Sequence, residues 1–222
     1  MMQPEDKIQE IAERAERLQE IGSSILRVAR DELYLGMRFL DVALSSFSYQ
    51  MDGQVHGFGT DGRVMYFQPQ MLGGLYRENR ILVNRGYLHM VFHCIFRHLW
   101  IRGNRDSDLW NLSCDIAVEW IIDSFDKKSV KRALSGIRTN IYNDFEKQNI
   151  PVTAANIYHY LLSDVTENPD RLNQLTMEFF TDDHRFWPKD PSRSPSAAKA
   201  GQSWDKISRR MEQELNLRGN HT

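Results

Sequence analysis

The feature that most restricts how this chain can fold is a long apolar run of helical character between about Glu78 and Arg102. Its apolar positions are Ile81, Leu82, Leu88, Val91, Phe92, Ile95, Phe96, Leu99 and Trp100. A helix that is apolar around most of its circumference is buried rather than laid on a surface. Gly103 is expected to end the helix, because glycine is favoured just past the last helical turn. We therefore predict a central helix around which the other elements pack.

A second apolar helix is predicted to follow at once, over residues 107–125. Asp106 and Ser107 stand at its start and can cap its first free N–H groups. Two helices joined by a short turn pack antiparallel. The helix at 107–125 should therefore lie against the helix at 78–102.

Helical patterns occupy much of the remaining chain. Apolar residues spaced by three and four predict a first amphipathic helix through Ile8, Ile11, Ala15, Leu18, Gly22, Ile25 and Ala29. A second stripe, with the acidic Asp31 and Glu32 at its start, passes through Leu33, Met37, Leu40, Leu44 and Phe47. Helical segments are also expected at 129–148 and from a cap at Thr153 to about Leu162.

Two short β-prone runs interrupt the helices after Gly53. They flank the turn Gly59–Gly62 and predict a β-hairpin. Pro69 follows the second run, Val64–Gln68, and has no N–H for pairing, so we expect this strand at a sheet edge. An exposed edge can accept an extended peptide, although a hairpin can equally serve only to cover the core.

The C-terminal part of the chain changes character after Trp187. Residues 187–203 are rich in Pro, Ser and Lys, which is typical of a linker. One more helical stripe then passes through Trp204, Ile207, Met211 and Leu215. This helix either folds back on the preceding domain or belongs with a further one. We therefore predict a domain at 1–190, followed by a linker and helix at 191–222.

Composition indicates a folded domain of the α+β class, mostly helical, with a small antiparallel hairpin or sheet. The 222 residues are 41% hydrophobic and 26% charged, which is typical of a globular protein. A net charge of −2 provides no general attraction for nucleic acid or an anionic membrane. The chain shows neither a signal-peptide pattern nor an apolar run of membrane-spanning length, which favours the cytoplasm. Cys94 and Cys114 lie in apolar runs and are expected to be reduced core thiols.

Three histidines fall close together on the predicted central helix. His89 and His93 are four residues apart, so their imidazoles share one helix face and can converge on one metal ion. The same spacing also suits core histidines that hydrogen-bond to neighbours. The apolar residues around the pair favour the metal, because two buried imidazoles without partners are costly. His98 lies off this face and is expected to orient a ligand or cap the helix end.

Asp115 is the unusual residue of the next helix. It shares a face with Leu112 and Ile122, and a buried carboxylate is tolerated mainly when it is paired or ligated. With His89 and His93 it would form a His-His-Asp site with an open fourth position, as catalytic zinc sites have. Asp115 and Glu119, one turn further on, could instead form buried salt bridges or hydrogen bonds, for example with Arg102 or His98.

Several segments together resemble the metallopeptidase-like domain found in front of von Willebrand factor A-like (VWA-like) domains in bacterial proteins. They are Ala29–Asp41, Gly59–Gly62 with Tyr66–Pro69, the His89 helix, Arg105–Val118 and Asp182–Trp187. The resemblance implies a zincin-like core, in which an edge strand lies beside a helix carrying His-Glu-x-x-His. His89 and His93 match the two histidines, Asp115 is the best match for a third ligand, and one zinc ion per chain is implied.

The sequence departs from the zincin pattern at one position, Met90. Met90 stands where zincins have the glutamate that acts as general base, and a thioether cannot accept that proton. Peptidase activity is therefore expected to be impaired or absent, with Glu119 only a weak candidate to replace the base. His184, in the Asp182-Asp183-His184 motif, is expected either to fold over the site as an alternative ligand or to lie in a surface loop.

Two hypotheses about function follow. In the first, the chain is a zinc-binding, metallopeptidase-like domain with impaired hydrolysis. In the second, it is a non-catalytic module that binds peptides or proteins, with the Val64–Gln68 edge as the candidate surface. The family's architecture implies a VWA-like domain after residue 222 and an AAA+ ATPase as partner. Nucleotide-binding folds are set aside, because Gly57-x-Gly59 lacks the phosphate-loop pattern.

Overall fold

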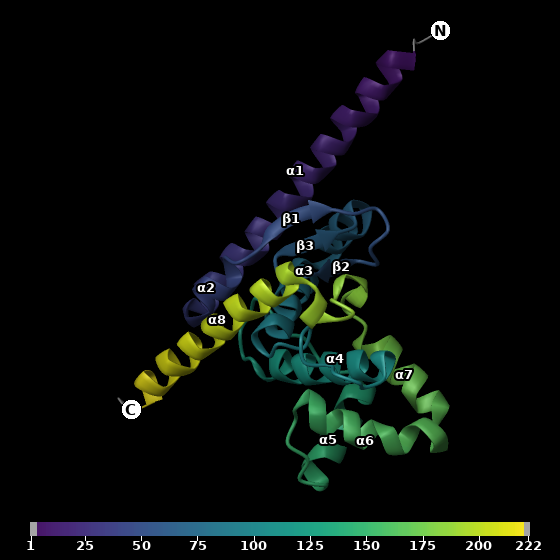
Figure 1. The fold of residues 1–222 in the computed structure, drawn as a ribbon, viewed down its shortest axis with the longest axis vertical. Helices are drawn as coiled ribbons and strands as arrows, with labels where there is room; N and C mark the ends of the chain where they lie inside the picture. The colour runs from purple at the N-terminus through teal and green to yellow at the C-terminus, as the bar shows by residue number, and fades with distance from the viewer. Residues whose placement is uncertain (1–3, 220–222) are drawn as a thin grey trace.

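The computed structural model describes residues 4–219, without the side chains of residues 4, 164–167 and 214–219. The fold is mostly helical with a small mixed sheet, so the predicted α+β class is confirmed (Figure 1). The helices are α1 (Pro4–Gly36), α2 (Asp41–Leu44), α3 (Pro69–Ile95), α4 (Ser107–Ser124), α5 (Gly136–Lys147), α6 (Ala154–Glu167), α7 (Pro169–Phe179) and α8 (Pro195–Gly219). The strands are β1 (Ser48–Met51), β2 (Phe58–Thr60) and β3 (Val64–Phe67), and short 3-10 turns lie at Arg38–Leu40, His184–Phe186 and Pro191–Arg193.

The sheet confirms the predicted hairpin but places it differently. Strand β3 pairs antiparallel with β2, as expected, and also parallel with β1, so the order is β1-β3-β2. The prediction that Val64–Gln68 forms an edge is therefore wrong, and the sheet is mixed rather than antiparallel. Pro69 does not limit the pairing, because it lies beyond the ladder as the first residue of α3, where its missing N–H costs nothing.

Helix α3 is shifted relative to the prediction. It begins at Pro69, bends at Asn79, where the backbone leaves the helical region, and ends at Ile95 instead of near Gly103. Arg97 adopts the left-handed conformation (φ 62°), and the His98 N–H donates to the carbonyl of His93 at 3.0 Å. This is the Schellman arrangement that ends many helices, here with arginine in the place usually taken by glycine. The early end turns His98 back towards the helix.

Helix α4 follows the prediction closely, with Asp106 accepting hydrogen bonds from the N–H groups of Asp108 and Leu109. Its residues divide between two cores. Val118 and Ile122 belong to a core shared with α1, the sheet, α3 and α8. The second core, shared with α5, α6 and α7, takes Leu109, Trp110, Leu112, Cys114, Ile116 and Ala117. The polar face of α4 that carries Asp115 and Glu119 is therefore enclosed between two apolar layers.

Helix α1 is one continuous element through Gly36, where the sequence predicted a new helix around Leu33. The second stripe is broken by a 3-10 turn and the single turn α2. The N-terminal half of α1 projects beyond the rest of the fold, as Figure 1 shows, and Ile8 and Ile11 are exposed. Further along, Gly22 lies against the ring of Phe67, where a Cβ atom would clash.

Helix α8 folds back onto the first core, which was one of the two arrangements expected. Trp204 is buried, and its indole N–H donates to the carbonyl of Gly62 at 2.7 Å. The helix begins at Pro195, inside the stretch predicted as a linker. The side chain of Leu215, the last residue of the predicted stripe, lies outside the described residues. The domain division at residue 190 stays a prediction.

Two further expectations concern single elements. The predicted helix at 129–148 is shorter, as α5, and Thr153 caps α6 by accepting from the N–H of Asn156. Cys94 and Cys114 are free and buried, in keeping with core thiols. Within the described residues, none of the helices combines the length and apolar character needed to pass through a bilayer.

Candidate metal centre

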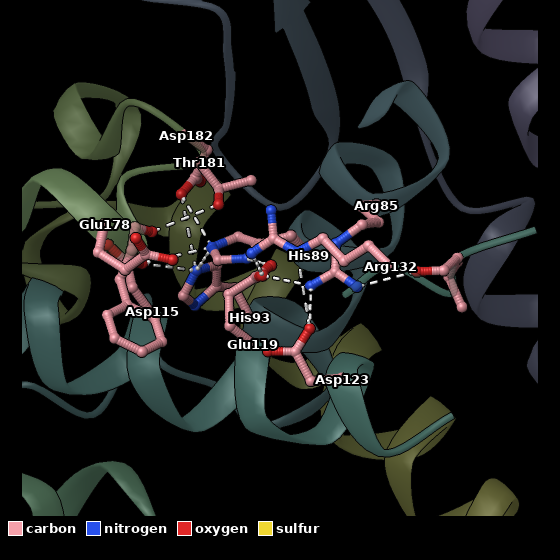
Figure 2. Close-up of polar contacts among 12 residues, drawn as sticks. Arg85, His89, His93, Asp115, Glu119, Asp123, Arg132, Glu178, Thr181 and Asp182 are labelled. Atoms are coloured by element: carbon pink, nitrogen blue, oxygen red, sulfur yellow. Dashed lines mark hydrogen bonds and ion pairs between the residues drawn. The ribbon is translucent and has the colours of Figure 1, made fainter. Parts of the chain in front are cut away.

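Four buried side chains from three separate segments meet between α3 and α4. His89 and His93 come from α3, Asp115 from α4, and Asp182 from the segment after α7 (Figure 2). One ligand atom from each lies within 4.8 Å of the other three. The structure thus brings together the three residues predicted as metal ligands and adds Asp182 to them.

The distances within this cluster are those of atoms around a common centre. The two Nε2 atoms of His89 and His93 are 2.7 Å apart. Asp115 Oδ1 lies 3.3 Å from Nε2 of His89 and 3.2 Å from Nε2 of His93, and Asp182 Oδ1 lies 3.3 and 3.7 Å from the same atoms. Nitrogen and oxygen ligands in a tetrahedral zinc site are roughly 3.3 Å apart, given metal–ligand distances of about 2.0–2.1 Å. The nitrogen–oxygen distances are close to this spacing, whereas the Nε2–Nε2 distance of 2.7 Å is shorter. The four atoms can surround a single small cation once the two imidazoles separate slightly.

The Nδ1 atoms of His89 and His93 both contact other side chains, and these contacts orient the Nε2 atoms towards the cluster. Nδ1 of His89 lies 2.9 Å from Oε1 of Glu119, so it carries the proton that this carboxylate accepts. Nδ1 of His93 lies 3.0 Å from Nδ1 of His98. Metal-bound histidines usually have their other ring nitrogen held in this way. The prediction that His98 supports a ligand thus corresponds to a direct contact in the structure.

Several buried polar atoms at this cluster lack a hydrogen-bond partner among the described residues. Both carboxylate oxygens of Asp182 and Nε2 of His184 are buried and make no hydrogen bond. Nε2 of His184 lies 3.0 Å from Oδ1 of Asp115 and 3.0 Å from Oδ1 of Asp182. Buried polar groups without hydrogen bonds are costly, so they need a partner of another kind. A divalent cation would offset both carboxylates and could take Nε2 of His184 after that imidazole loses its proton.

The ionisation of the cluster is tightly coupled. Burial would raise the pKa of Asp115 and Asp182, but the neighbouring His184 outweighs it and holds both pKa values below the usual range. Burial would lower the pKa of His184, but Asp115 and Asp182 raise this pKa to about 10. The carboxylates are thus in the charged form that a metal requires, while His184 must lose a proton before it can coordinate.

Glu119 lies in a buried ionic network behind His89, on the side away from its Nε2 atom (Figure 2). Its Oε2 accepts from Arg85 at 2.5 Å and from Arg138 at 2.7 Å, and Asp123 accepts from the same two arginines. Burial would raise the pKa of Glu119, but its hydrogen bond to His89 and the two arginines keep it far lower. Glu119 is therefore a charged residue that orients His89, and it is badly placed to act as a general base.

Replacing Glu119 with Gln is expected to lower metal affinity roughly 10- to 100-fold, as the loss of such supporting carboxylates typically does. Asp123→Asn is the matched control, because it removes a carboxylate from the same arginines without touching His89. Competition with a chromophoric chelator would measure both variants. Equal losses in the two would show that the network supports stability alone, which would contradict an orienting role for Glu119.

Met90 is fully buried and packs among the apolar residues of the first core. Its place supports the simple interpretation of a packing residue. The position that resembled the catalytic glutamate of zincins is thus directed into apolar surroundings.

An open cleft of about 710 Å³ leads to the cluster. The cleft is lined by three residues of the site, Asp115, Asp182 and His184. Its other walls include the apolar Leu99, Leu112 and Phe180 and the polar Asn111, Asn173 and Thr176. A substrate entering this cleft would meet the carboxylate side of the cluster, because His89 and His93 lie deeper and are fully buried.

Asp182 is the residue that reasoning from the sequence missed as a ligand. The Asp182-Asp183-His184 motif drew attention only to its histidine. The carboxylate is brought in by the segment after α7, whose Asp183 N–H donates to the carbonyl of Phe58 on the outer edge of β2 at 2.7 Å. Phe186 stacks on Tyr66 with ring centroids 3.9 Å apart. These contacts with the sheet could not be foreseen from the spacing of residues along the chain.

Comparison with known families gives one match. A family model described as "Putative metallopeptidase domain" matches residues 23–171 of the chain. The matched range contains His89, His93 and Asp115, whereas Asp182 and His184 lie beyond it. Neither a curated protein nor a solved structure matches the chain significantly.

Proposed function

This chain belongs to the "Putative metallopeptidase domain" family, and on that premise we propose that it binds one zinc ion and hydrolyses peptide bonds weakly or not at all. The observation that carries the proposal is the convergence of His89, His93, Asp115 and Asp182 at the end of an open cleft. His184 is the additional donor beside them.

In this proposal the chain's own residues hold and orient the metal. His89 and His93 present Nε2, because Glu119 and His98 occupy the opposite nitrogens. Asp115 and Asp182 supply negative charge that offsets the ion. When bound, zinc would act as a Lewis acid that polarises a carbonyl group and makes a water molecule more acidic.

The weak hydrolysis follows from the lack of a general base in reach. A base must lie within hydrogen-bond distance of the proton that it takes, directly or through one water. Of the described carboxylates that line the cleft, Asp183 is held by Arg185 at 2.7 Å, and Asp108 is seven residues before Asp115, roughly 10 Å along the helix. The loss of a positioned base typically costs about 10²- to 10⁴-fold in rate.

The second hypothesis, a peptide- or protein-binding module, loses one of its supports. The Val64–Gln68 strand is the centre of the sheet and offers no free edge. The cleft, with its apolar and amide side chains, is the surface that could hold a peptide without cutting it. A VWA-like domain and an AAA+ ATPase remain proposed partners, and they rest on the family resemblance alone.

The test is elemental analysis of protein purified without chelators or immobilised-metal columns, combined with a casein-cleavage assay. We expect roughly one zinc per chain, lost in His93→Ala, and casein cleavage that is absent or only slightly above that of this variant. Protein that carries no metal and gains none on addition of zinc would overturn the metal site. Zinc-dependent cleavage at a rate typical of intact zinc peptidases, lost in His93→Ala, would overturn the impaired hydrolysis.

A further inference from the structure

A second cavity lies against the residue that supports His93. It has a volume of about 370 Å³ and is enclosed by the chain after α3, one face of α4 and the start of α6. Its lining residues are Phe96, His98, Ile101, Arg105, Trp110, Ala117, Ile121 and Val152–Ala155. None of these residues lines the cleft over the metal cluster. The cavity is thus a separate site with mainly apolar walls.

The polar side chains at this cavity include His98 and Arg105, which bear nitrogen, and Thr153, which bears a hydroxyl group. His98 is the most informative, because it is 3% exposed and its Nδ1 faces Nδ1 of His93 at 3.0 Å. When His93 presents its Nε2 to the cluster, its Nδ1 carries the proton and donates to His98. The proton of His98 is then on Nε2, for which no hydrogen-bond partner is found among the described residues. In this tautomer His98, which lines the pocket, carries one N–H without a hydrogen-bond partner among the described residues.

Arg105 adds positive charge to the same pocket. Its guanidinium lies 4.7 Å from the centre of the Trp110 ring. Within the described part of the chain it donates to the backbone carbonyls of Ile101 and Arg102 and to no side chain. Among the described residues no carboxylate forms an ion pair with Arg105, and none lines the cavity. The first-turn N–H groups of Ala154 and Ala155, at the start of α6, also lack partners within their helix.

We propose that this cavity binds a small carboxylic acid with an apolar body. The apolar walls would take the body, and the carboxylate would lie among the N–H group of His98, the guanidinium of Arg105 and the start of α6. A charged acceptor suits this set of donors, because hydrogen bonds to a charged group are the stronger ones. Ligand pockets of this size are usually apolar, with a few polar groups that fix the orientation of the ligand. The proposal goes beyond the metal site. It rests on the proposed metal binding at His93 for the tautomer of His98, but it does not depend on hydrolysis.

The probe for this proposal is octanoate, compared with octan-1-ol and octylamine by isothermal titration calorimetry on the full chain. We expect octanoate to bind at least roughly tenfold more tightly than octan-1-ol, since a charged acceptor gains more from these donors. Octylamine should not bind detectably. Equal affinity for octanoate and octan-1-ol, or no binding of octanoate, would overturn the proposal.

Two variants localise the binding. Arg105→Gln should lower octanoate affinity roughly tenfold and leave octan-1-ol unchanged, because only the carboxylate uses the charge. Ala155→Trp, at a half-buried position in the first turn of α6, should fill the cavity and remove the binding of both. Circular dichroism would establish that each variant is folded. Octanoate binding that survives unchanged in a folded Ala155→Trp would place the ligand elsewhere and contradict the proposal.

Discussion

Asp182→Asn is expected to reduce zinc affinity by more than the roughly 10- to 100-fold that loss of a supporting residue costs. Asn keeps the size of the side chain but removes the charge from a group whose two oxygens are buried without hydrogen bonds. His184 then also loses one of the two carboxylates beside it. Competition titration with a chelator of known affinity, together with the zinc content of the purified variant, would measure the effect.

Asp108→Asn is the matched control for this prediction. Asp108 lines the same cleft and undergoes the same chemical change, but it lies at the start of α4, away from the cluster. The zinc affinity of the Asp108→Asn variant should equal that of the unmodified chain. If Asp182→Asn also retains full affinity, Asp182 is not a ligand and the site consists of His89, His93 and Asp115.

Met90→Glu is expected to destabilise the protein by roughly 3 kcal/mol or more, because it places a carboxyl group without a partner in an apolar core. The side chain of Met90 is 0% exposed, and the residue belongs to the core shared by α1, the sheet and α3. The variant should therefore lose stability in a urea titration and gain no peptidase activity. Comparison with a zincin would suggest the opposite result, since glutamate at this position is the catalytic residue there.

Met90→Leu separates the charge from the change of shape in this experiment. A swap between apolar residues of similar volume usually costs less than about 1.5 kcal/mol. A Met90→Glu variant that is as stable as Met90→Leu, and that cleaves casein in the presence of zinc, would show that position 90 reaches the cleft. The packing role assigned to Met90 would then be wrong.

Local patterns were enough to predict α4 and the residues of α3 that face the site. The apolar period and the Asp106 cap predicted α4 almost to the residue. The spacing of His89 and His93 placed both on one helix face, and the apolar neighbours of Asp115 indicated a carboxylate in need of a partner. All three predictions depend on interactions within a few residues along the chain, which sequence patterns describe well.

Other features escaped prediction because their causes are distant or unusual. Strand β1 exists through its pairing with β3, and its short sequence carries no strong signal of its own. The end of α3 was misplaced because arginine, instead of glycine, takes the left-handed position at residue 97. That early end is what brings His98 into contact with His93.

The amino-acid order was sufficient to specify a helical domain, a pair of imidazoles one turn apart and a buried acid on the next helix. Helical period, capping and burial are short-range properties, so they can be recognised without coordinates. The completion of the cluster by Asp182 and His184, the turning of Glu119 away from the cleft and the enclosure of Met90 arise from contacts between distant segments. Each of these depends on how α4, the sheet and the chain after α7 pack against α3, and such packing leaves no periodic trace in the sequence.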